Sequence, residues 1–264
     1  MTATSDDNAR LLSGMSALAL EAGALALSIY QEDFDIDHKA DASPVTEADR
    51  LGEEIILKGL GRLAPAIPVL AEEAASEGRI PELGSAFFLV DPLDGTREFI
   101  TKTGEFTVNI ALVRDGRPRL GVVYAPAIGK LYLGAAGAGA TLAMVDGGKP
   151  GAAMPIRVRP RPTKGLIAVA SRSHRSPETD EFLSTLDVAD FAAAGSSLKF
   201  CLIAEGLADV YPRLGRTMEW DTAAGQAVLE AAGGRVVEFG GETTLRYGKR
   251  ERGFDNPHFI AWGG

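Results

Sequence analysis

The sequence is short of cysteine, histidine and basic blocks, and each shortage argues against a class of function. Its one cysteine, Cys201, excludes an internal disulfide bond and fits a reducing cytoplasm. With three histidines and no nucleophile-elbow pattern, nothing indicates a Ser-His-Asp or Cys-His triad. The 27 Lys and Arg residues are outnumbered by 36 Asp and Glu and form no long run, which argues against a nucleic-acid polymer as partner.

An apolar stretch over residues 11–30 raises the question of a signal sequence or a membrane span. Asp6 and Asp7 precede it where a signal peptide would be basic, and Glu21 interrupts it. Its apolar residues recur at helical spacing, at Leu11, Met15, Leu18, Ala22, Leu25 and Ile29. The pattern predicts an amphipathic helix on a soluble core, without a stable membrane span, in a cytoplasmic protein.

The length of 264 residues and the 45% hydrophobic content allow one large domain or two modest ones. A basic, proline-containing segment at 157–164 separates two different orders of predicted helices and strands. Before it, two helices precede strands joined by tight turns, and after it strands alternate with helices. We therefore predict an N-terminal α+β domain (1–160) with an antiparallel sheet and a C-terminal α/β domain (161–264). The predicted strands of the first part are 86–90, 106–114, 120–124, 130–133, 140–145 and 156–159.

The motif Asp-Pro-Leu-Asp-Gly-Thr at 91–96 follows the apolar strand 86–90. Two carboxylates three positions apart would face opposite sides of a continuing strand, so the chain must turn between them. Pro92 should end the ladder, and Gly95 permits unusual backbone angles. Such a turn can direct both carboxylates and the Leu93 carbonyl to one point, which suits Mg²⁺. The residues after the acids predict a helix start with amides open to phosphate.

Each of these acids also has a purely structural interpretation. Asp-Pro and Asp-Gly pairs are common in surface turns. Asp49 lies three positions after Thr46, a capping-box pattern that explains it as well as chemistry does. Asp221 could be the N-cap of a helix beginning at Thr222. The functional interpretation gains weight because Glu72 follows a further apolar segment upstream and Asp221 opens a small-residue helix far downstream.

Taken together, Glu72-Glu73, the motif 91–96 and Trp-Asp-Thr-Ala-Ala-Gly at 220–225 resemble the three metal-binding motifs of the inositol monophosphatase superfamily. The superfamily comprises Mg²⁺-dependent, lithium-sensitive phosphomonoesterases, and the resemblance covers nearly the whole chain. Within it, the chain is more similar to the bacterial CysQ-type 3′(2′),5′-bisphosphate nucleotidases, at residues 97–100, 104–112, 171–174, 195–201 and 211–213. The resemblance implies a five-layered αβαβα sandwich and removal of the 3′-phosphate from adenosine 3′,5′-bisphosphate.

The resemblance also implies a set of metal ligands and two or three Mg²⁺ ions. Glu72, Asp91 and the Leu93 carbonyl would hold the first ion. Asp91, Asp94 and Asp221 would hold the second, with Asp91 bridging. Two such ions can hold a phosphoryl group, activate water and stabilise the leaving oxygen.

Other residues receive roles by the same comparison. Asp49 and Thr96 would position and deprotonate the attacking water, and the amides of Gly95 and Thr96 would bind phosphate. The expected substrate-binding residues are His174, Ser196, Lys199 and Arg213. Each of these has an alternative as an ordinary structural or solvated side chain.

Two other functions stay open on the sequence alone. The same metal ligands would serve an inositol monophosphatase or a phosphatase of another sugar or alcohol phosphate. A non-catalytic, metal-dependent phosphate binder is the alternative from another class, although every residue that catalysis needs is present. In each case the partner is a small phosphorylated molecule, here a nucleotide bisphosphate, and the protein could be a monomer or a homodimer.

Overall fold

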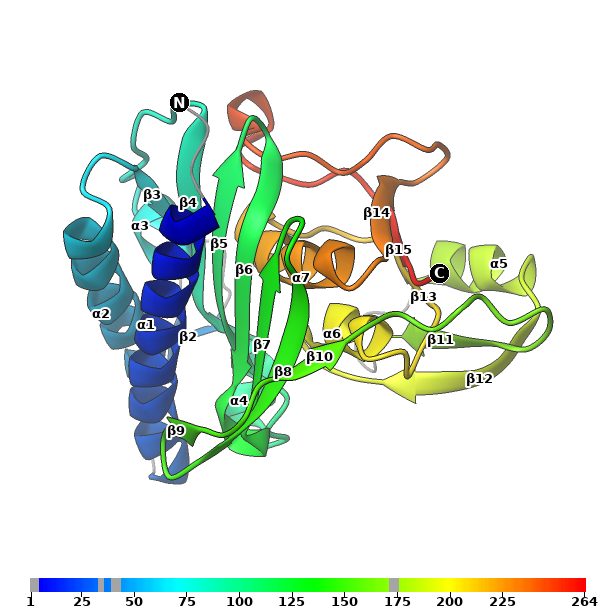
Figure 1. The fold of residues 1–264 in the computed structure, drawn as a ribbon, viewed down its shortest axis with the longest axis horizontal. Coiled ribbons are helices and arrows are strands. Elements are labelled where there is room, and N and C mark those ends of the chain that lie inside the picture. The colour runs from blue at the N-terminus through cyan, green and yellow to red at the C-terminus, as the bar shows by residue number, and fades with distance from the viewer. Residues whose placement is uncertain (1–4, 33–35, 39–43, 171–175) are drawn as a thin grey trace.

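The computed structural model describes residues 5–32, 36–38, 44–170 and 176–264. These residues form five layers, visible from left to right in Figure 1. Helices α1 (Ser5–Gln31) and α2 (Glu47–Leu63) cover one face of a large sheet. Helices α6 (Leu198–Ala204) and α7 (Glu219–Ala231) lie between that sheet and a second sheet, whose far face carries α5 (Pro177–Ser184). The predicted αβαβα sandwich is confirmed.

The large sheet has the strand order β10-β8-β7-β6-β5-β4-β3, and β9 pairs with β8. Its neighbours are antiparallel, except that β3 runs parallel to β4. The strands are β3 (Val69–Ala71), β4 (Ala86–Asp94), β5 (Thr107–Arg114), β6 (Arg117–Ala125), β7 (Lys130–Ala135), β8 (Gly139–Asp146), β9 (Lys149–Pro150) and β10 (Met154–Ile156). A separate pair joins β1 (Ile36–His38) to β2 (Pro44–Thr46).

The second sheet has the order β12-β11-β13-β15-β14. It is mixed, because β11 is parallel to β12 and β13 whereas β15 is antiparallel to β13 and β14. Its strands are β11 (Leu166–Ala170), β12 (Val188–Ala193), β13 (Val210–Arg213), β14 (Arg235–Glu238) and β15 (Phe259–Trp262). The short helices are α3 (Glu72–Ser76), α4 (Thr96–Ile100), η1 (Pro126–Ile128) and η2 (Arg250–Arg252).

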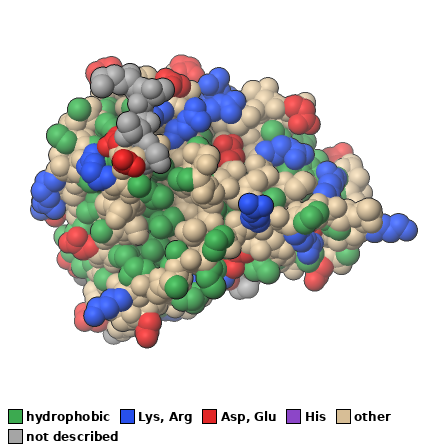
Figure 2. Space-filling model, viewed as in Figure 1, with side chains coloured by type: hydrophobic (Ala, Val, Ile, Leu, Met, Phe, Trp, Pro, Cys, Tyr) green, Lys and Arg blue, Asp and Glu red, His purple; other side chains and the backbone are tan. Residues whose placement is uncertain are grey.

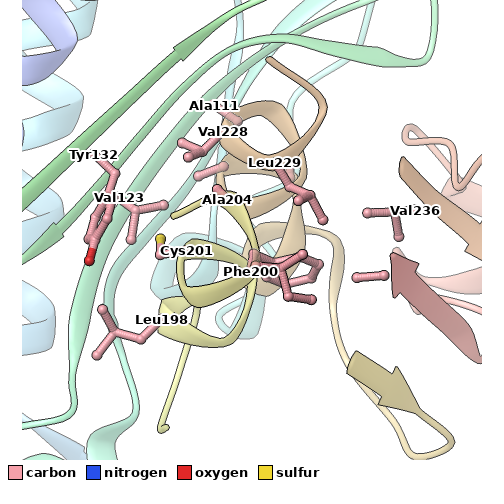
Figure 3. Close-up of a cluster of buried hydrophobic side chains, with 14 of the residues drawn as sticks. Ala111, Val123, Tyr132, Leu198, Phe200, Cys201, Ala204, Val228, Leu229 and Val236 are labelled. Atoms are coloured by element: carbon pink, nitrogen blue, oxygen red, sulfur yellow. The ribbon is translucent and has the colours of Figure 1, made fainter. Parts of the chain in front are cut away.

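Alternation along the central strands divides the core in two. In β4, Phe88 and Val90 pack toward α1 and α2, whereas Phe87 and Leu89 pack toward α6 and α7, as the two-residue period of a strand requires. The second core continues from the large sheet through α6 and α7 to β14, as Figure 3 shows from Val123 to Val236. The boundary at residues 160 and 161 stays a prediction, since both halves of the chain contribute to this core.

Most predicted elements are present, with four corrections. The strand predicted at 156–159 lies at Met154–Ile156 instead, as β10. The ladder of β4 does not end at Pro92, because pairing resumes at Asp94 after a bulge. The helix α7 begins at Glu219, not at Thr222, so Asp221 is its third residue and not its N-cap. Strand β15, in the interior of the second sheet, was not predicted.

Helix α1 passes a test of length and composition for a membrane span. In the fold one face of α1 packs against the large sheet and α2, where Leu11, Met15, Ala19 and Ala22 are at most 1% exposed. Figure 2 shows further hydrophobic side chains gathered beside α1, over the large sheet. On the same face, Lys and Arg side chains are scattered and form no continuous band.

Arg159 and Asp209 form a bidentate pair that fastens the segment between the two sheets. Arg159 donates from Nε (2.7 Å) and Nη2 (2.5 Å), and the Ile167 amide donates to the same carboxylate at 2.6 Å. Burial opposes ionisation of Asp209, but these hydrogen bonds outweigh it and lower the pKa of the carboxyl group. The pair therefore contributes stability above the unfolded-state pKa, and that contribution is lost as the pH falls through the lower, folded-state pKa.

We expect Asp209→Asn to lower the free energy of unfolding by about 2 kcal/mol at pH 7, discounted because Arg159 is about a third exposed. The difference between wild type and variant should begin to shrink below about pH 4, where the carboxylate becomes protonated in the unfolded state, and should disappear only below the lower, folded-state pKa. Urea unfolding of both proteins at pH 7, 5 and 3 measures this difference in the free energy of unfolding. A difference that stays constant over this range would contradict the ionic role of the pair.

Candidate active site

The bulge in β4 brings Asp91 and Asp94 to one face of the large sheet. Asp91 pairs with Asn109 and Asp94 pairs with Thr107, so three steps along β4 match two steps along β5. The extra residue restores the alternation that a three-residue spacing would otherwise break. Both carboxylates therefore face α6 and α7. The Leu93 side chain is anchored on the opposite side, in a cluster with Phe99 and Phe106.

Acids from three distant segments meet at a cavity of about 310 Å³. Glu72 reaches it from the first residue of α3, Asp94 from the end of β4 and Asp221 from the first turn of α7. Asp91 is 2% exposed, and it lies close enough to Glu72, Asp94 and Asp221 for their charges to raise its pKa, after the larger effect of burial. The structure thus brings together the four acidic side chains that the sequence proposes as metal ligands.

The electrostatics of the acids show how strongly they repel one another. Burial, followed by the charges of Glu72, Asp94 and Asp221, raises the pKa of Asp91 well above its usual value. Burial and the neighbouring acids likewise raise the pKa of Asp221. The pKa of Asp94 rises to about 6, because its burial outweighs the opposing effects of Lys199 and Asn109.

The acidic oxygen atoms of this cavity are of the type that binds a hard divalent cation such as Mg²⁺. Carboxylates are ligands that Mg²⁺ takes, and positive charge would offset both the burial and the repulsion that raise the pKa values of Asp91 and Asp221. The Leu93 carbonyl lies 3.5 Å from Thr96 Oγ1, and its predicted contact with metal stays a proposal. Over the described residues, no three histidine, cysteine or acidic side chains form a ready-made cation site. The residue-by-residue assignment of ligands therefore stays a proposal.

Asp49 and Thr96 lie together at the edge of the site. The Thr96 hydroxyl donates to Asp49 Oδ1 at 3.3 Å, although 47 residues separate the two. Asp49 Oδ2 accepts the amide (2.8 Å) and the hydroxyl (2.7 Å) of Thr46, so the capping box is also present. The two sequence interpretations of Asp49 are thus compatible, because each uses a different oxygen of the carboxylate.

Gly95 and Ser196 join the two halves of the chain at the cavity wall. Gly95 has a φ of 93°, the left-handed region, and is the N-cap of α4. A Cβ atom there would lie 2.2 Å from Ser196 Oγ. That hydroxyl is 2.7 Å from the Asp94 carbonyl and 2.8 Å from the Glu105 carbonyl, its two acceptors. The geometry gives Ser196 a bridging role, and its predicted contact with substrate stays a proposal.

Three cationic side chains, Arg97, Lys199 and Arg213, line the same cavity as the acids, and the last two are among the predicted substrate-binding residues. Lys199, the second residue of α6, is 8% exposed, and its ammonium group is 5.6 Å from the centre of the Tyr211 ring. Burial lowers the pKa of Lys199 to about 8, and the charge of Asp94 opposes this shift. Arg213, at the end of β13, donates to the Arg216 carbonyl at 3.0 Å and lines the cavity. His174 lies outside the described residues.

The polar residues that support Asp94, from β5 and from the N-cap of α6, were not predicted from the sequence. Asn109 Nδ2 donates to Asp94 Oδ2 (3.2 Å) and to Ser197 Oγ (3.0 Å), and Ser197 Oγ donates to the Asp221 carbonyl (2.9 Å). Thr107 lies 3.5 Å from the same Asp94 oxygen. These residues are at most 1% exposed. The sequence did carry a signal for them: Thr107 and Asn109 are two polar residues, two positions apart, in an otherwise apolar strand, and buried polar side chains need hydrogen-bond partners.

The arrangement of layers places the chain among the layered α+β phosphatases of known structure. More closely, the chain belongs to the inositol monophosphatase family, whose sequence profile matches residues 7–259. The similarity thus extends over both sheets and all three acidic segments.

Similar proteins narrow the comparison within this family. The chain is 43% identical to the 3′(2′),5′-bisphosphate nucleotidase CysQ of Salmonella typhimurium, covering 94% of this chain and 98% of that protein. The crystal structure of CysQ from Bacteroides thetaiotaomicron superposes with a TM-score of 0.79 at 41% identity, covering 95% and 97%. An inositol monophosphatase from Anabaena is more distant, with a TM-score of 0.73 at 27% identity, covering 96% and 90%.

Proposed function

We propose that the protein is an Mg²⁺-dependent phosphomonoesterase that removes the 3′-phosphate of adenosine 3′,5′-bisphosphate and releases AMP and phosphate. The family and the near full-length similarity to CysQ nucleotidases support this activity. In the structure, the supporting observation is Lys199, a buried cation in the same cavity as the acids. A substrate with two phosphates needs a cationic group for the phosphate that is retained. The enzyme would serve sulfur assimilation and nucleotide recycling in the cytoplasm.

Glu72, Asp91, Asp94, Asp221 and the Leu93 carbonyl would hold Mg²⁺, as two or three ions. When bound, the metal supplies positive charge to the transferred phosphoryl group and lowers the pKa of water. The protein's part is to hold these oxygens on rigid elements around one cavity.

The proton path runs through Thr96 and Asp49. A water molecule attacks phosphorus and forms the new P–O bond while the bond to the 3′-oxygen breaks. The water gives a proton to Thr96 Oγ1, whose own proton passes to Asp49 Oδ1 along the observed hydrogen bond. The leaving 3′-oxygen takes up a proton from solvent water and becomes the 3′-hydroxyl of AMP. The amides of Gly95 and Thr96, at the start of α4, would bind the oxygens of the phosphoryl group.

A comparison of substrates tests this function. We expect phosphate release to be faster from adenosine 3′,5′-bisphosphate than from inositol 1-phosphate, and to stop when a chelator removes Mg²⁺. Colorimetric phosphate assays on both compounds, with and without chelator, measure this. Preference for inositol 1-phosphate would assign the chain the activity of its more distant relatives. Release that continues in chelator would contradict metal dependence.

Lys199→Met should weaken the preference of the enzyme for adenosine 3′,5′-bisphosphate over adenosine 3′-monophosphate. A charge-assisted hydrogen bond contributes about 1.5–3 kcal/mol, so kcat/KM on adenosine 3′,5′-bisphosphate should fall about 10- to 100-fold. On adenosine 3′-monophosphate, which lacks the retained phosphate, the loss should be much smaller. Lys164→Met, at an exposed lysine, is the control. Equal losses on both substrates would mean that Lys199 acts on the reacting phosphate or on Asp94.

A further inference from the structure

Helix α3, which carries Glu72 as its first residue, lacks a side-chain cap of its own, because its N-cap residue is Ala71. Its first amides donate instead to Glu53 of α2. The Glu73 amide is 2.7 Å from Oε2, and the Ala74 amide is 2.8 Å from Oε1. Glu53 is 3% exposed. A buried carboxylate from another helix therefore satisfies two amides that a helix start otherwise leaves open.

Glu53 lies one helical turn after Asp49, so the two carboxylates share a face of α2. Asp49 contacts Thr96 on this face. Gly52 lies beside them, and a Cβ atom there would be 3.4 Å from Pro92 in the bulge of β4. One face of a 17-residue helix thus contacts α4, the bulge and α3, the segments that carry Thr96, the aspartates and Glu72.

We propose that Glu53 is a positioning residue, which holds Glu72 in place beside Asp91 for cation binding. This inference rests on the proposed function, which makes Glu72 a metal ligand. A helix of five residues has little stability of its own, so the position of α3 depends on its contacts. Glu53 is well placed to fix it, because it holds both amides that follow Glu72 with a single rigid group.

Glu53→Gln tests the proposal with little change in shape. The glutamine keeps one acceptor oxygen but turns an amide donor toward a backbone N–H, so one of the two hydrogen bonds is lost. Changes to groups that support a metal ligand cost roughly 10- to 100-fold in metal affinity. We expect that loss in calorimetric titration of the protein with Mg²⁺ alone. The Mg²⁺ concentration for half-maximal phosphate release should rise in parallel, with kcat at saturating Mg²⁺ largely retained.

Glu54→Gln is the matched control, because Glu54 is the next residue of α2 and pairs with Lys58 on the surface. It removes the same charge from the same helix without touching α3, and its metal affinity should equal that of wild type. Should Glu53→Gln fail to fold, Glu53→Asp gives the same readouts, since it keeps the charge but withdraws it by one methylene group. Metal affinity equal to wild type in the folded variant would overturn the proposal.

A double-mutant cycle separates positioning from a long-range effect of charge. If Glu53 acts through Glu72, then Glu53→Gln should weaken Mg²⁺ binding in wild type but not further in Glu72→Gln. Equal effects in both backgrounds would overturn the positioning role. Measurements on the wild type distinguish a failure of the proposed function from a failure of the inference about Glu53. Absence of Mg²⁺ binding and phosphate release in the wild type speaks against the proposed function, whereas an unaffected Glu53 variant of an active enzyme speaks against this inference alone.

Discussion

Replacing Asp91 by asparagine is expected to abolish Mg²⁺-dependent phosphate release, with a loss in kcat/KM of about 10³-fold or more. Burial first, and then the charges of Glu72, Asp94 and Asp221, raise the pKa of Asp91, so this acid lies near all three of the others. Metal-derived stabilisation of the transition state is worth several kcal/mol, and about 4 kcal/mol corresponds to three orders of magnitude. The proposed bridging role makes this the most sensitive position of the site.

The same substitution should not destabilise the metal-free protein. The asparagine oxygen still accepts the Leu93 amide, which lies 3.0 Å from Asp91 Oδ1, and one source of repulsion is removed. We therefore expect the melting temperature without metal to be unchanged or raised, and the increase that Mg²⁺ gives the wild type to disappear. Differential scanning fluorimetry with and without Mg²⁺ measures both effects.

Asp190→Asn, on the exposed edge strand β12, provides the control for the loss of one negative charge. It should retain both turnover and the Mg²⁺-dependent increase in melting temperature. Full Mg²⁺-dependent turnover in Asp91→Asn would remove the mechanism proposed here. A variant that unfolds even without metal would mean that Asp91 is primarily structural.

Sequence patterns predicted the acids of the site because each lies in a locally readable context. The apolar run 86–90 marks a buried strand, and the motif 91–96 combines a proline, a glycine and two acids that a regular strand cannot accommodate. The sequence showed that the chain must turn there, but not how. Whether pairing stops or continues through a bulge depends on β5, where Thr107 and Asn109 offer partners again.

Local sequence patterns could not predict the residues that hold the acids in place, because tertiary packing determines their hydrogen-bond partners. Glu53 is one of several acids on α2, and only the fold shows that it accepts the amides of α3 while Glu54 faces solvent. Strand β15 was missed for a related reason. It is a four-residue apolar run, Phe259–Trp262, and its place between β13 and β14 arises from long-range pairing.

Thr96→Val is expected to lower kcat by about 10²-fold or more, the usual contribution of a positioned group that transfers a proton. Valine has nearly the same shape as threonine but lacks the hydroxyl that donates to Asp49 Oδ1. Thr96→Ser keeps a hydroxyl and should retain most activity. Steady-state kinetics at saturating Mg²⁺ compare the three proteins. Substrate KM and Mg²⁺ affinity should change little, because Thr96 is not among the proposed metal ligands.

Asp49→Asn then separates the two roles of its carboxylate. Asparagine keeps one acceptor oxygen, so it can accept from Thr46 or from Thr96 but not from both. The loss of stability should therefore stay below the roughly 1 kcal/mol of a lost helix cap, whereas Thr96→Val leaves the hydrogen bonds to Thr46 intact. Both single variants should lose kcat to a similar extent. The double variant should be no slower than the slower single one, since residues on one proton path act as a unit. Multiplicative losses would show that Thr96 and Asp49 act independently, and full activity of Thr96→Val would exclude its hydroxyl from the path.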